Sequence, residues 1–554
     1  TFIGLFVNSR TDPTPRSAGL ASPAPDPPPD VGTPTPVVAA GSPARAPCAA
    51  APPVGLLLTG PAVLSGRSRR TAPGGAFGLA GPATVSACGG TTAKSTAAEA
   101  IRRAEAMRRS TGQRLVTAKL TPRATTVDLG GPVVNTWAYG DSVPGPLLRA
   151  RAGDLLRVQV DNQLPATTSV HWHGIALHNA MDGVPGMTQA PIGAGKPFTY
   201  EFTVPDPGTY FYHPHSGLQI DRGLYGALLV DDADDPGGYD VEWTVVLDDW
   251  VDGTGRTPEQ ILKGLTAAAG SGHDMSGMDM GSGMGEAMSS PLLGGAGDIA
   301  YPHYLANGRV PAAPVTLSAK PGQRARLRLV NAGSDTAFRV ALGGHRLTIT
   351  HSDGFPVAPV TTDALLIGMG ERYDVMVKVG DGVFPLVALA EGKQGNALAL
   401  VRSAAGTSPT ASARPAELAG KVILSTDLTA AAAVRLPVKD VDRSHDLLLS
   451  GSMAPYRWTI NGKTFPDAEP LPVEAGQRVR LRFQNMSMMF HPMHVHGHTF
   501  GLVRGGARKD TVIVRPMQTV EVDLDANNPG QWATHCHNIY HAETGMMTTL
   551  SYQS

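Results

Sequence analysis

A short phrase that recurs three times constrains the fold of this chain more than any other feature. It runs from Gly153 to Asn162 and returns from Gly322 to Asn331 and from Gly476 to Asn485. Each copy opens with a Gly turn and continues with apolar residues at every second position, as in half-buried strands. The sequence therefore predicts an all-β protein with three copies of one domain, and the many Gly and Pro residues between short β-branched runs favour Greek-key sandwiches.

Composition indicates a large protein without affinity for nucleic acid. Lys and Arg number 46 against 47 Asp and Glu, so the net charge of -1 gives no electrostatic basis for binding DNA or RNA. A hydrophobic content of 42% over 554 residues suffices for several cores. We expect domains at residues 113–236, 237–410 and 411–554, with the Ser/Ala/Pro-rich span Ser403 to Pro415 linking the last two. No stretch is long enough to span a membrane, and a monomer is favoured.

The first 112 residues are predicted to be disordered and to carry an export signal. Residues Pro13 to Pro53 are rich in Pro and Ala and lack apolar periodicity. Arg69 and Arg70, an apolar run from Ala76 to Ala87, and Cys88 resemble a twin-arginine signal with a lipoprotein cleavage site before Cys88. We therefore expect an exported, extracytoplasmic protein with a possible lipid anchor at Cys88. The alternative is a chance Arg pair in an Ala/Gly-rich linker.

The segment HCHNIYHAETGM near the C-terminus combines a thiol, three imidazoles and a thioether. Blue-copper sites use two His and one Cys with a weak axial Met, and Cys536, His541 and Met546 supply three of these ligands. His535 and His537 flank the Cys in what is predicted to be a strand, so their side chains point to the opposite face. They are candidates for a second metal centre behind Cys536.

Three further clusters bring the candidate imidazole ligands to ten. They are His171 with His173, His213 with His215, and His491 with His494 and His496. A single His pair is more often a surface or core feature than a ligand. Four such clusters with a Cys between two His favour a metal site, and His178, His273, His303, His345, His351, His445 and His498 are left as non-ligands.

The motifs HWHG, HPH, HPMHVHGH and HCHNIYHAETGM, in this order, resemble the four copper signatures of the multicopper oxidases, the laccase and cuprous oxidase family. The resemblance covers Leu115 to the C-terminus and implies three cupredoxin domains with four copper ions, one of type 1, one of type 2 and two of type 3. It implies type 1 ligands His491, Cys536, His541 and Met546. It implies type 2 ligands His171 and His494, and type 3 ligands His173, His213, His215, His496, His535 and His537.

The internal repeat predicts which domains hold which metal. The segment from Pro207 to His215 aligns with the segment from Pro529 to His537, and Pro214 stands where Cys536 does. Only the third copy can then form a thiolate site. The middle copy has no His cluster after Asn331 and is interpreted as a spacer, so the three-copper cluster is expected where copies one and three meet.

The resemblance implies that O2 is reduced to water with electrons that pass from Cys536 to His535 and His537. Asp182 occupies the position where the family has a carboxylate near the cluster, so a role in proton transfer is expected. The alternative is a turn Asp before Gly183. Ala542 stands where some cuprous oxidases have a proton-relaying Glu, and Glu543, one residue along, is the candidate for this role or for a carboxylate near the type 1 edge.

Cu(I) is the favoured electron donor, with laccase-like oxidation of phenols as a side activity. The segment from His273 to Met288 contains five Met among Gly, Ser and Asp, and thioethers are soft ligands suited to Cu(I). Met489 matches a Met beside the substrate copper of cuprous oxidases, whereas Ser487 falls where those enzymes have Asp. The alternatives are an inert linker for the Met-rich segment, a non-catalytic protein that sequesters copper, and a two-domain nitrite reductase, which lacks a third repeat.

Overall fold

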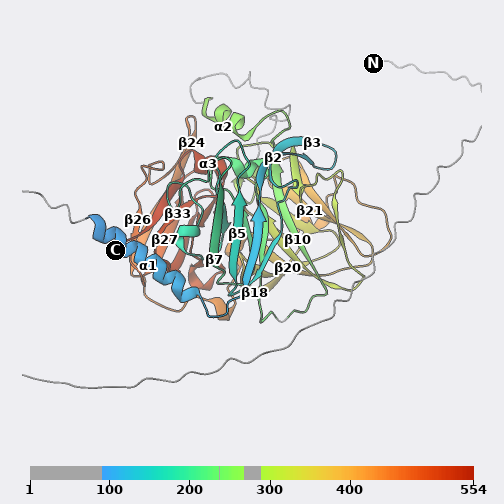
Figure 1. The fold of residues 1–554 in the computed structure, drawn as a ribbon. Helices are drawn as coiled ribbons and strands as arrows, with labels where there is room; N and C mark the ends of the chain where they lie inside the picture. The colour runs from blue at the N-terminus through green and yellow to red at the C-terminus, as the bar shows by residue number, and fades with distance from the viewer. Residues whose placement is uncertain (1–89, 236, 268–288, 554) are drawn as a thin grey trace, which may run out of the picture. The chain divides into compact units, whose positions relative to one another are not determined.

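The computed structural model describes residues 90–235, 237–267 and 289–553, with side chains from residue 98 onward. The predicted export signal with Cys88 and the Met-rich segment 273–288 lie outside the described residues. Strands dominate the described chain (Figure 1), and each larger sheet draws its strands from one of three consecutive stretches of sequence. The predicted all-β fold with three sandwiches is confirmed.

The first sandwich contains strands β1 to β9. Two sheets have the orders β1-β5-β7 and β4-β9-β8-β6, and β2 pairs with β3 as a hairpin. Aromatic side chains such as Trp172, Tyr200 and Tyr212 fill the core between the sheets. The strands are β1 (Leu115–Leu120), β2 (Pro122–Asp128), β3 (Val133–Tyr139), β4 (Leu148–Arg151), β5 (Leu155–Asp161), β6 (His171–His173), β7 (Pro197–Thr203), β8 (Gly208–His213) and β9 (Gly226–Asp231).

The second sandwich consists of two six-stranded sheets with the orders β13-β10-β15-β20-β17-β18 and β14-β22-β21-β16-β19-β23, together with the short pair β11-β12. Its strands are β10 (Val241–Trp250), β11 (Ser289–Ser290), β12 (Gly294–Gly295), β13 (His303–Ala306), β14 (Val315–Ser318), β15 (Arg324–Asn331), β16 (Phe338–Leu342), β17 (Leu347–Ser352), β18 (Phe355–Thr362), β19 (Ala364–Ile367), β20 (Arg372–Lys378), β21 (Val383–Ala390), β22 (Asn396–Arg402) and β23 (Val422–Ile423).

The third sandwich packs the sheet β25-β24-β27-β32-β29-β30 against the sheet β26-β34-β33-β28-β31. Its strands are β24 (Arg443–Met453), β25 (Tyr456–Ile460), β26 (Leu471–Val473), β27 (Arg478–Asn485), β28 (His491–Val495), β29 (Phe500–Leu502), β30 (Arg508–Lys509), β31 (Thr511–Val514), β32 (Thr519–Asp525), β33 (Gln531–Cys536) and β34 (Met547–Tyr552).

The recurring phrase forms β5, β15 and β27, and it has the same structural role in each sandwich. Every copy pairs in parallel with an earlier strand, β1, β10 or β24, and antiparallel with a later one, β7, β20 or β32. The Asn that ends each phrase uses its side-chain amide to donate to backbone carbonyls, three for Asn162 and two each for Asn331 and Asn485. Asn485, for example, donates to Met489 O at 2.7 Å and to Val514 O at 3.0 Å. The Asn is therefore kept because it fixes the loop that follows the strand, and in the third copy that loop leads into His491.

Helix α1 (Gly90–Arg108) differs from the prediction that the chain up to residue 112 is disordered. Its sequence is rich in Ala, which has the highest helix propensity, and it packs on the first and third sandwiches. Ala104 is buried, Arg108 Nη2 donates to Asn528 Oδ1 at 2.9 Å, and Arg109 pairs with Glu201 at 3.0 Å. Tertiary contacts thus order a segment whose composition alone indicated disorder.

The remaining helices are short. They are α2 (Pro258–Ala267), α3 (Ile539–Glu543), and the 3-10 turns η1 (Asn179–Met181), η2 (Gln219–Arg222), η5 (Ala416–Ala419), η6 (Ser425–Asp427), η7 (Ala432–Val434) and η8 (Val503–Gly505). None of the helices in the described part of the chain has the length and apolar content that crossing a bilayer requires.

Candidate metal centres

One group of candidate ligands lies inside the third sandwich. His491 begins β28, Cys536 ends β33 and His541 lies on α3. Cys536 Sγ is 3.6 Å from Nδ1 of His491 and 3.6 Å from Nδ1 of His541, and the two Nδ1 atoms are 3.1 Å apart. Met546 is held next to them, because its N–H donates to His541 O and its carbonyl accepts from the Cys536 N–H. All four side chains are fully buried.

The chemistry of this group suits a soft cation. Burial raises the pKa of the Cys536 thiol well above its ordinary value, and the nearby carboxylates of Asp298 and Asp335 raise it further, although a backbone hydrogen bond at Asn538 opposes them. A thiolate at this position therefore requires a positive charge beside it. A copper ion between one sulfur and two imidazole nitrogens would supply that charge.

The outer nitrogens of both imidazoles are held by side chains. His491 Nε2 lies 2.8 Å from Ser487 Oγ, and His541 Nε2 lies 2.9 Å from Asp298 Oδ2, which also accepts from Tyr456 OH at 2.6 Å. A carboxylate partner fixes the proton of His541 on Nε2, so Nδ1 keeps its lone pair for a metal. Both rings are thus oriented with Nδ1 toward Cys536.

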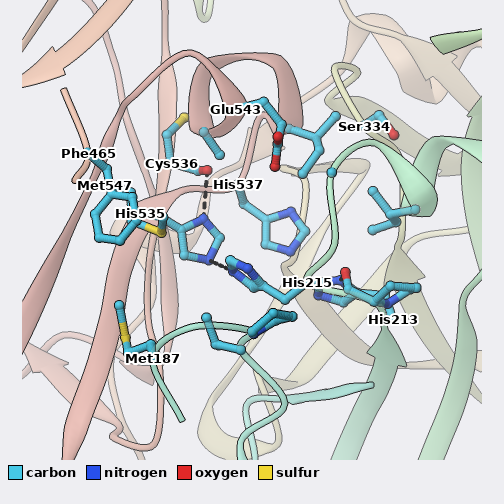
Figure 2. Close-up of a pocket in the computed structure, with 17 residues that line it drawn as sticks. Met187, His213, His215, Ser334, Phe465, His535, Cys536, His537, Glu543 and Met547 are labelled. Carbon is cyan, nitrogen blue, oxygen red and sulfur yellow. Dashed lines mark hydrogen bonds between the residues drawn. The ribbon is translucent and has the colours of Figure 1, made fainter. Parts of the chain in front are cut away.

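The other eight predicted His converge from β6, β8, β28 and β33, which belong to the first and third sandwiches. One set joins His215, His496 and His535. The Nε2 atoms of His496 and His535 are 3.0 Å apart, and those of His215 and His535 are 3.5 Å apart. Figure 2 shows His215 and His535 next to one another in the lining of a pocket that His213 and His537 also line. Such close nitrogen pairs are the geometry expected around a shared cation.

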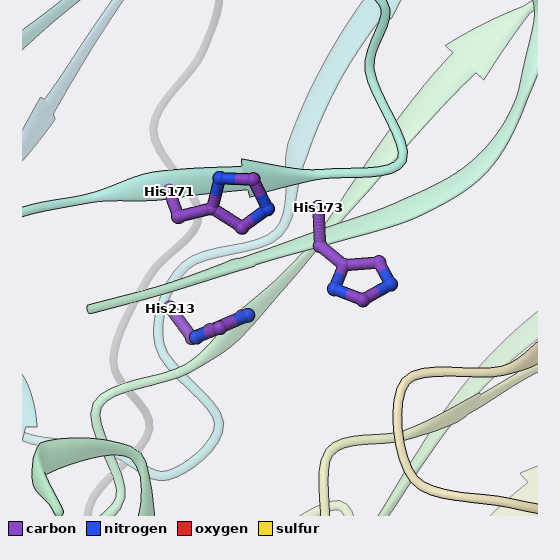
Figure 3. Close-up of side chains that lie close together, drawn as sticks. All are labelled: His171, His173 and His213. Carbon is purple, nitrogen blue, oxygen red and sulfur yellow. The ribbon is translucent and has the colours of Figure 1, made fainter. Parts of the chain in front are cut away.

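The remaining five His carry ring nitrogens with no hydrogen-bond partner, although they are buried. His171 Nδ1 lies 2.8 Å from Asp182 O and His494 Nδ1 lies 2.9 Å from Asp510 O, while Nε2 of each has no partner within the described residues. Figure 3 shows His171 close to two neighbours from β6 and β8. Unpartnered buried nitrogens are costly unless a metal binds them. They are His171 Nε2, His173 Nδ1, His213 Nε2, His494 Nε2 and both ring nitrogens of His537.

Burial keeps these imidazoles neutral. It is the main cause that lowers the pKa well below the ordinary value in His173, His213, His215, His496, His535 and His537. A neutral imidazole has the lone pair that metal binding requires. The histidine cluster is therefore poised to hold cations, and it needs residues from two sandwiches to be complete.

Asp182 lies against this cluster. Its Oδ2 is 2.9 Å from His496 Nδ1 and its Oδ1 is 3.2 Å from His171 Nδ1, so it joins a His of the first sandwich to one of the third. Gly183 permits this approach, because its φ is +83° and a Cβ there would lie 1.9 Å from Val170 O. Asp182 is thus more than a turn residue, since it orients two candidate ligands.

Glu543 takes a different place from Asp182. It lines the pocket that also contains His535 and His537 (Figure 2), and its side chain remains exposed. No hydrogen bond joins it to a His among the described residues. The carboxylate beside the buried imidazole of His541 is Asp298.

The middle sandwich contributes residues that the sequence analysis did not identify. Besides Asp298, Asp335 Oδ1 accepts from Asn538 Nδ2 at 2.6 Å, and the side chain of Asn538 caps α3, which carries His541. Arg372 donates to both carboxylate oxygens of Asp510, at 2.7 and 2.6 Å, and Asp510 Oδ1 lies 3.2 Å from His173 Nε2. The interpretation of this copy as a spacer therefore missed its positioning role, because single Asp and Arg residues without a His motif give no signal in a sequence.

Comparison with known proteins agrees with this geometry. Three family models described as multicopper oxidase match residues 122–235, 242–405 and 440–554. The chain is 51% identical to multicopper oxidase MmcO of Mycobacterium tuberculosis, over 86% of this chain and 95% of that protein. The chain belongs to the multicopper oxidase family.

Two further relatives place the chain within this family. The copper resistance protein A homolog of Pseudomonas syringae pv. tomato is 30% identical, with 77% of this chain and 90% of that protein covered. The crystal structure of a laccase from Botrytis aclada superposes with a TM-score of 0.65 at 25% identity, over 80% of this chain and 88% of that one. As a multicopper oxidase, the protein is an oxidoreductase that uses O2, and its cofactor is a set of four copper ions. The paired and unpartnered nitrogens described above fit this cofactor.

Proposed function

We propose that the two groups of side chains bind the four copper ions of an oxidase that couples one-electron oxidation of a donor to reduction of O2 to water. His491, Cys536, His541 and Met546 would hold the type 1 ion. His171 and His494 would hold the type 2 ion through their Nε2 atoms. The type 3 pair would be shared between one set, His215, His496 and His535, and a second set, His173, His213 and His537. The convergence of His from two sandwiches carries this proposal.

The chain itself supplies the connection between the two centres. Copper ions held by these residues would supply the one-electron chemistry at the His491, Cys536 and His541 group and the O2 chemistry at the histidine cluster. Cys536 is covalently joined to His535 and His537, and His535 Nδ1 donates to Cys536 O at 2.8 Å. The same strand end therefore touches both centres. Asp182 holds His171 and His496 in register across the domain boundary and can accept or release a proton beside them.

We propose Cu(I) as the physiological donor. Met486 and Met488 are 55% and 74% exposed in the loop that leads to His491, and Met489 lies in the same loop. A Cβ at Gly295 of β12 would be 2.8 Å from Met489 Sδ, and β12 pairs with β11, which directly follows the Met-rich segment in sequence. Exposed thioethers near the type 1 ligands favour a soft monovalent cation as the donor. The copper resistance relatives support the same choice, and the laccase relatives support phenols as alternative donors.

Measurement of O2 uptake tests this proposal. Cu(I) and 2,6-dimethoxyphenol are compared as donors for the wild type, for a Met486→Leu/Met488→Leu variant and for a variant that lacks residues 273–288. Met107→Leu is the matched control, because Met107 is 74% exposed on α1 and far from His491 in sequence. We expect the rate of Cu(I) oxidation to fall in the Met486→Leu/Met488→Leu variant and in the deletion variant, but not in Met107→Leu. Oxidation of the phenol should persist in all of them. Unchanged Cu(I) turnover in both would exclude Cu(I) as the favoured donor, and copper binding without any O2 uptake would favour the alternative of sequestration.

We also propose that the protein acts outside the cytoplasmic membrane, anchored by a lipid on Cys88. The Arg69-Arg70 pair and the apolar run before Cys88 support export. Fractionation of cells that express the wild type and Cys88→Ala tests the anchor. Release of only the variant into the soluble fraction is expected, and equal distribution of both would exclude lipidation.

A further inference from the structure

A buried carboxyl group, Asp221, lies next to the cavity that borders the histidine cluster. This cavity has a volume of about 230 Å³, and its lining includes His213, His215, His535 and His537. Ile220 and Ser334 also line it, and Ile220 is the neighbour of Asp221 on η2. Its lining combines imidazole, hydroxyl and carboxyl groups with apolar side chains, and a cavity of this size has room for several water molecules. Water held against the polar groups would give protons a route to the cluster.

The hydrogen bonds of Asp221 leave one oxygen available. Oδ2 accepts from Tyr540 OH at 2.5 Å and from Tyr301 OH at 3.2 Å, whereas Oδ1 has no partner among the described residues. The residue is 1% exposed, so a charge on it would be poorly solvated. Because both phenols donate to Oδ2, Oδ1 is the atom that can carry a proton.

The surroundings of Asp221 favour the protonated form. Burial raises the pKa of Asp221, and the nearby Asp249 raises it further, so that it lies well above its ordinary value despite the opposing hydroxyls of Tyr540, Ser334 and Tyr301. Asp249 accepts the backbone N–H groups of Ser334 and Asp335. The other charged groups facing this region are already paired: Asp248 accepts from Tyr225 OH at 2.6 Å, and Lys393, above the ring of Tyr301, pairs with Asp335 at 2.6 Å. Asp221 therefore has no cationic partner among these groups that would favour its ionised form.

Ser334 connects this acid to the cavity. Its hydroxyl is close enough to Asp221 to oppose the rise in pKa, yet Oγ makes no hydrogen bond of regular geometry among the described residues. Ser334 also lines the cavity. A hydroxyl in this position can turn between the carboxyl and a water molecule and so pass a proton from one to the other.

We propose that Asp221 is a proton-relay residue that supplies protons through Ser334 and cavity water to the site where O2 is reduced. The proposal rests on the proposed function, since reduction of O2 to two water molecules consumes four electrons from the donor and four protons. Each proton that leaves Oδ1 leaves a carboxylate behind, and solvent that enters the cavity returns a proton before the next transfer. Asp182 touches the ligands directly, whereas Asp221 acts at a distance.

Asp221→Asn tests the relay, with Asp248→Asn as the matched control. Asn keeps an acceptor for the phenols but has no acidic proton, and Asp248 is a similarly buried acid whose pKa burial also raises well above its ordinary value. Copper content, blue absorption and anaerobic reduction of type 1 copper are measured first, and all should match the wild type. Reoxidation of the fully reduced enzyme by O2 is then followed over a range of pH. We expect it to be on the order of 100-fold slower in Asp221→Asn, at the lower end of what a positioned acid contributes, to lose part of its pH dependence, and to be unchanged in Asp248→Asn.

Two further measurements keep the test decisive if Asp221→Asn folds poorly. Ser334→Ala retains the two tyrosine partners of Asp221 and removes only the hydroxyl of the relay, so it should slow reoxidation without changing copper content. In the copper-free protein, the infrared difference spectrum should show the loss of the band of one protonated carboxyl in Asp221→Asn, separate from the one lost in Asp248→Asn, and no such loss in Ser334→Ala. Wild-type reoxidation rates in the copper-loaded Asp221→Asn or Ser334→Ala variant, equal slowing in Asp248→Asn, or no loss of the infrared band would overturn the relay. Failure of the copper-loaded wild type to consume O2 would instead overturn the proposed function. The infrared result is obtained on copper-free protein and therefore does not depend on O2 consumption.

Discussion

Strands β8 and β33 are equivalent strands in two sandwiches, and the difference with the largest consequences is the residue between the two His of each motif, Pro214 after β8 and Cys536 at the end of β33. In both, the first His of the motif is fixed by a hydrogen bond from Nδ1 to the next residue's carbonyl, 2.9 Å for His213 to Pro214 and 2.8 Å for His535 to Cys536. Each strand can thus present a pair of imidazoles to the shared cluster. Only β33 has a thiol between them, so only β33 can connect that cluster to a second centre.

The two strands also differ in their supports from the middle sandwich. Thr209 Oγ1 on β8 donates to Asp374 Oδ1 at 2.6 Å. The segment after β33 is held instead through Asn538, which binds Asp335, and through His541, which binds Asp298. The middle sandwich therefore supports the backbone of β8 in the first sandwich, whereas in the third it orients the candidate ligand that follows β33.

The largest effect is expected from Cys536→Ser. Loss of the only thiol in the site removes the soft ligand and the covalent link to His535 and His537, so donor oxidation and blue absorption should disappear. Metal analysis should find about one copper fewer per chain, with the cluster still loaded. A blue band that persists would contradict the assignment of Cys536.

Pro214→Cys is the converse test of the same comparison. It places a thiol just after β8, at the position equivalent to Cys536. In the first sandwich, however, Thr168 occupies the position equivalent to His491 of the third. We expect no second blue absorption band, because a thiolate needs two imidazoles beside it. Appearance of such a band would show that the thiol alone distinguishes the two strands.

Asp182→Asn tests the bridge between the first and third sandwiches. The Asn side chain cannot accept from His171 and His496 at both oxygens, so the two imidazoles lose part of their orientation. We expect a loss of copper affinity or of O2 reduction of about 10- to 100-fold, while the type 1 absorption stays. Titration with copper and stopped-flow reoxidation measure the two effects, and equal loss of the type 1 band would argue for general misfolding instead.

Asp374 should govern the acid stability of the support for β8. Burial opposes its ionisation, but Arg328 and Arg326 outweigh burial and lower the pKa of Asp374 from its ordinary value of 3.8 to about 2. Because the folded pKa lies below the unfolded one, this contribution to stability is complete above pH 3.8 and is lost as the pH falls toward 2. The shift corresponds to about 2 kcal/mol. The midpoint of urea unfolding should fall more steeply with acid in the wild type than in Asp374→Asn over this interval, and parallel curves would exclude the effect.

The smallest effect is expected from Asp298→Asn. The anionic partner of His541 makes the imidazole a stronger donor and stabilises oxidised copper, so its removal should raise the type 1 reduction potential. A tenfold change in the redox equilibrium would be about 59 mV, and we expect a rise of up to this size in redox titration. Ser487→Ala, which removes only a neutral partner of His491, should change the potential less. A lower potential in Asp298→Asn would contradict this role.

The sequence predicted those features that leave a contiguous pattern. The three strands β5, β15 and β27 follow from apolar alternation after a Gly, and the clusters of candidate ligands follow because each lies within a few residues of one strand end. Asp298, Asp335 and Arg372 could not be found in this way. Each is a single polar residue, and each meets its partner more than a hundred residues away only when the sandwiches pack together. Helix α1 was also missed. Its Ala-rich sequence favours a helix locally, but the helix is held by contacts with Glu201 and Asn528, which are distant in sequence.

The most direct test of the central claim is the location of copper in crystals of the loaded protein, by anomalous scattering at the copper absorption edge. The account predicts four peaks. One should lie between Cys536 Sγ and the Nδ1 atoms of His491 and His541, and three should lie among the eight His that β6, β8, β28 and β33 bring together. A fully loaded protein with no peak at Cys536, or with fewer than three peaks where the first and third sandwiches meet, would contradict it.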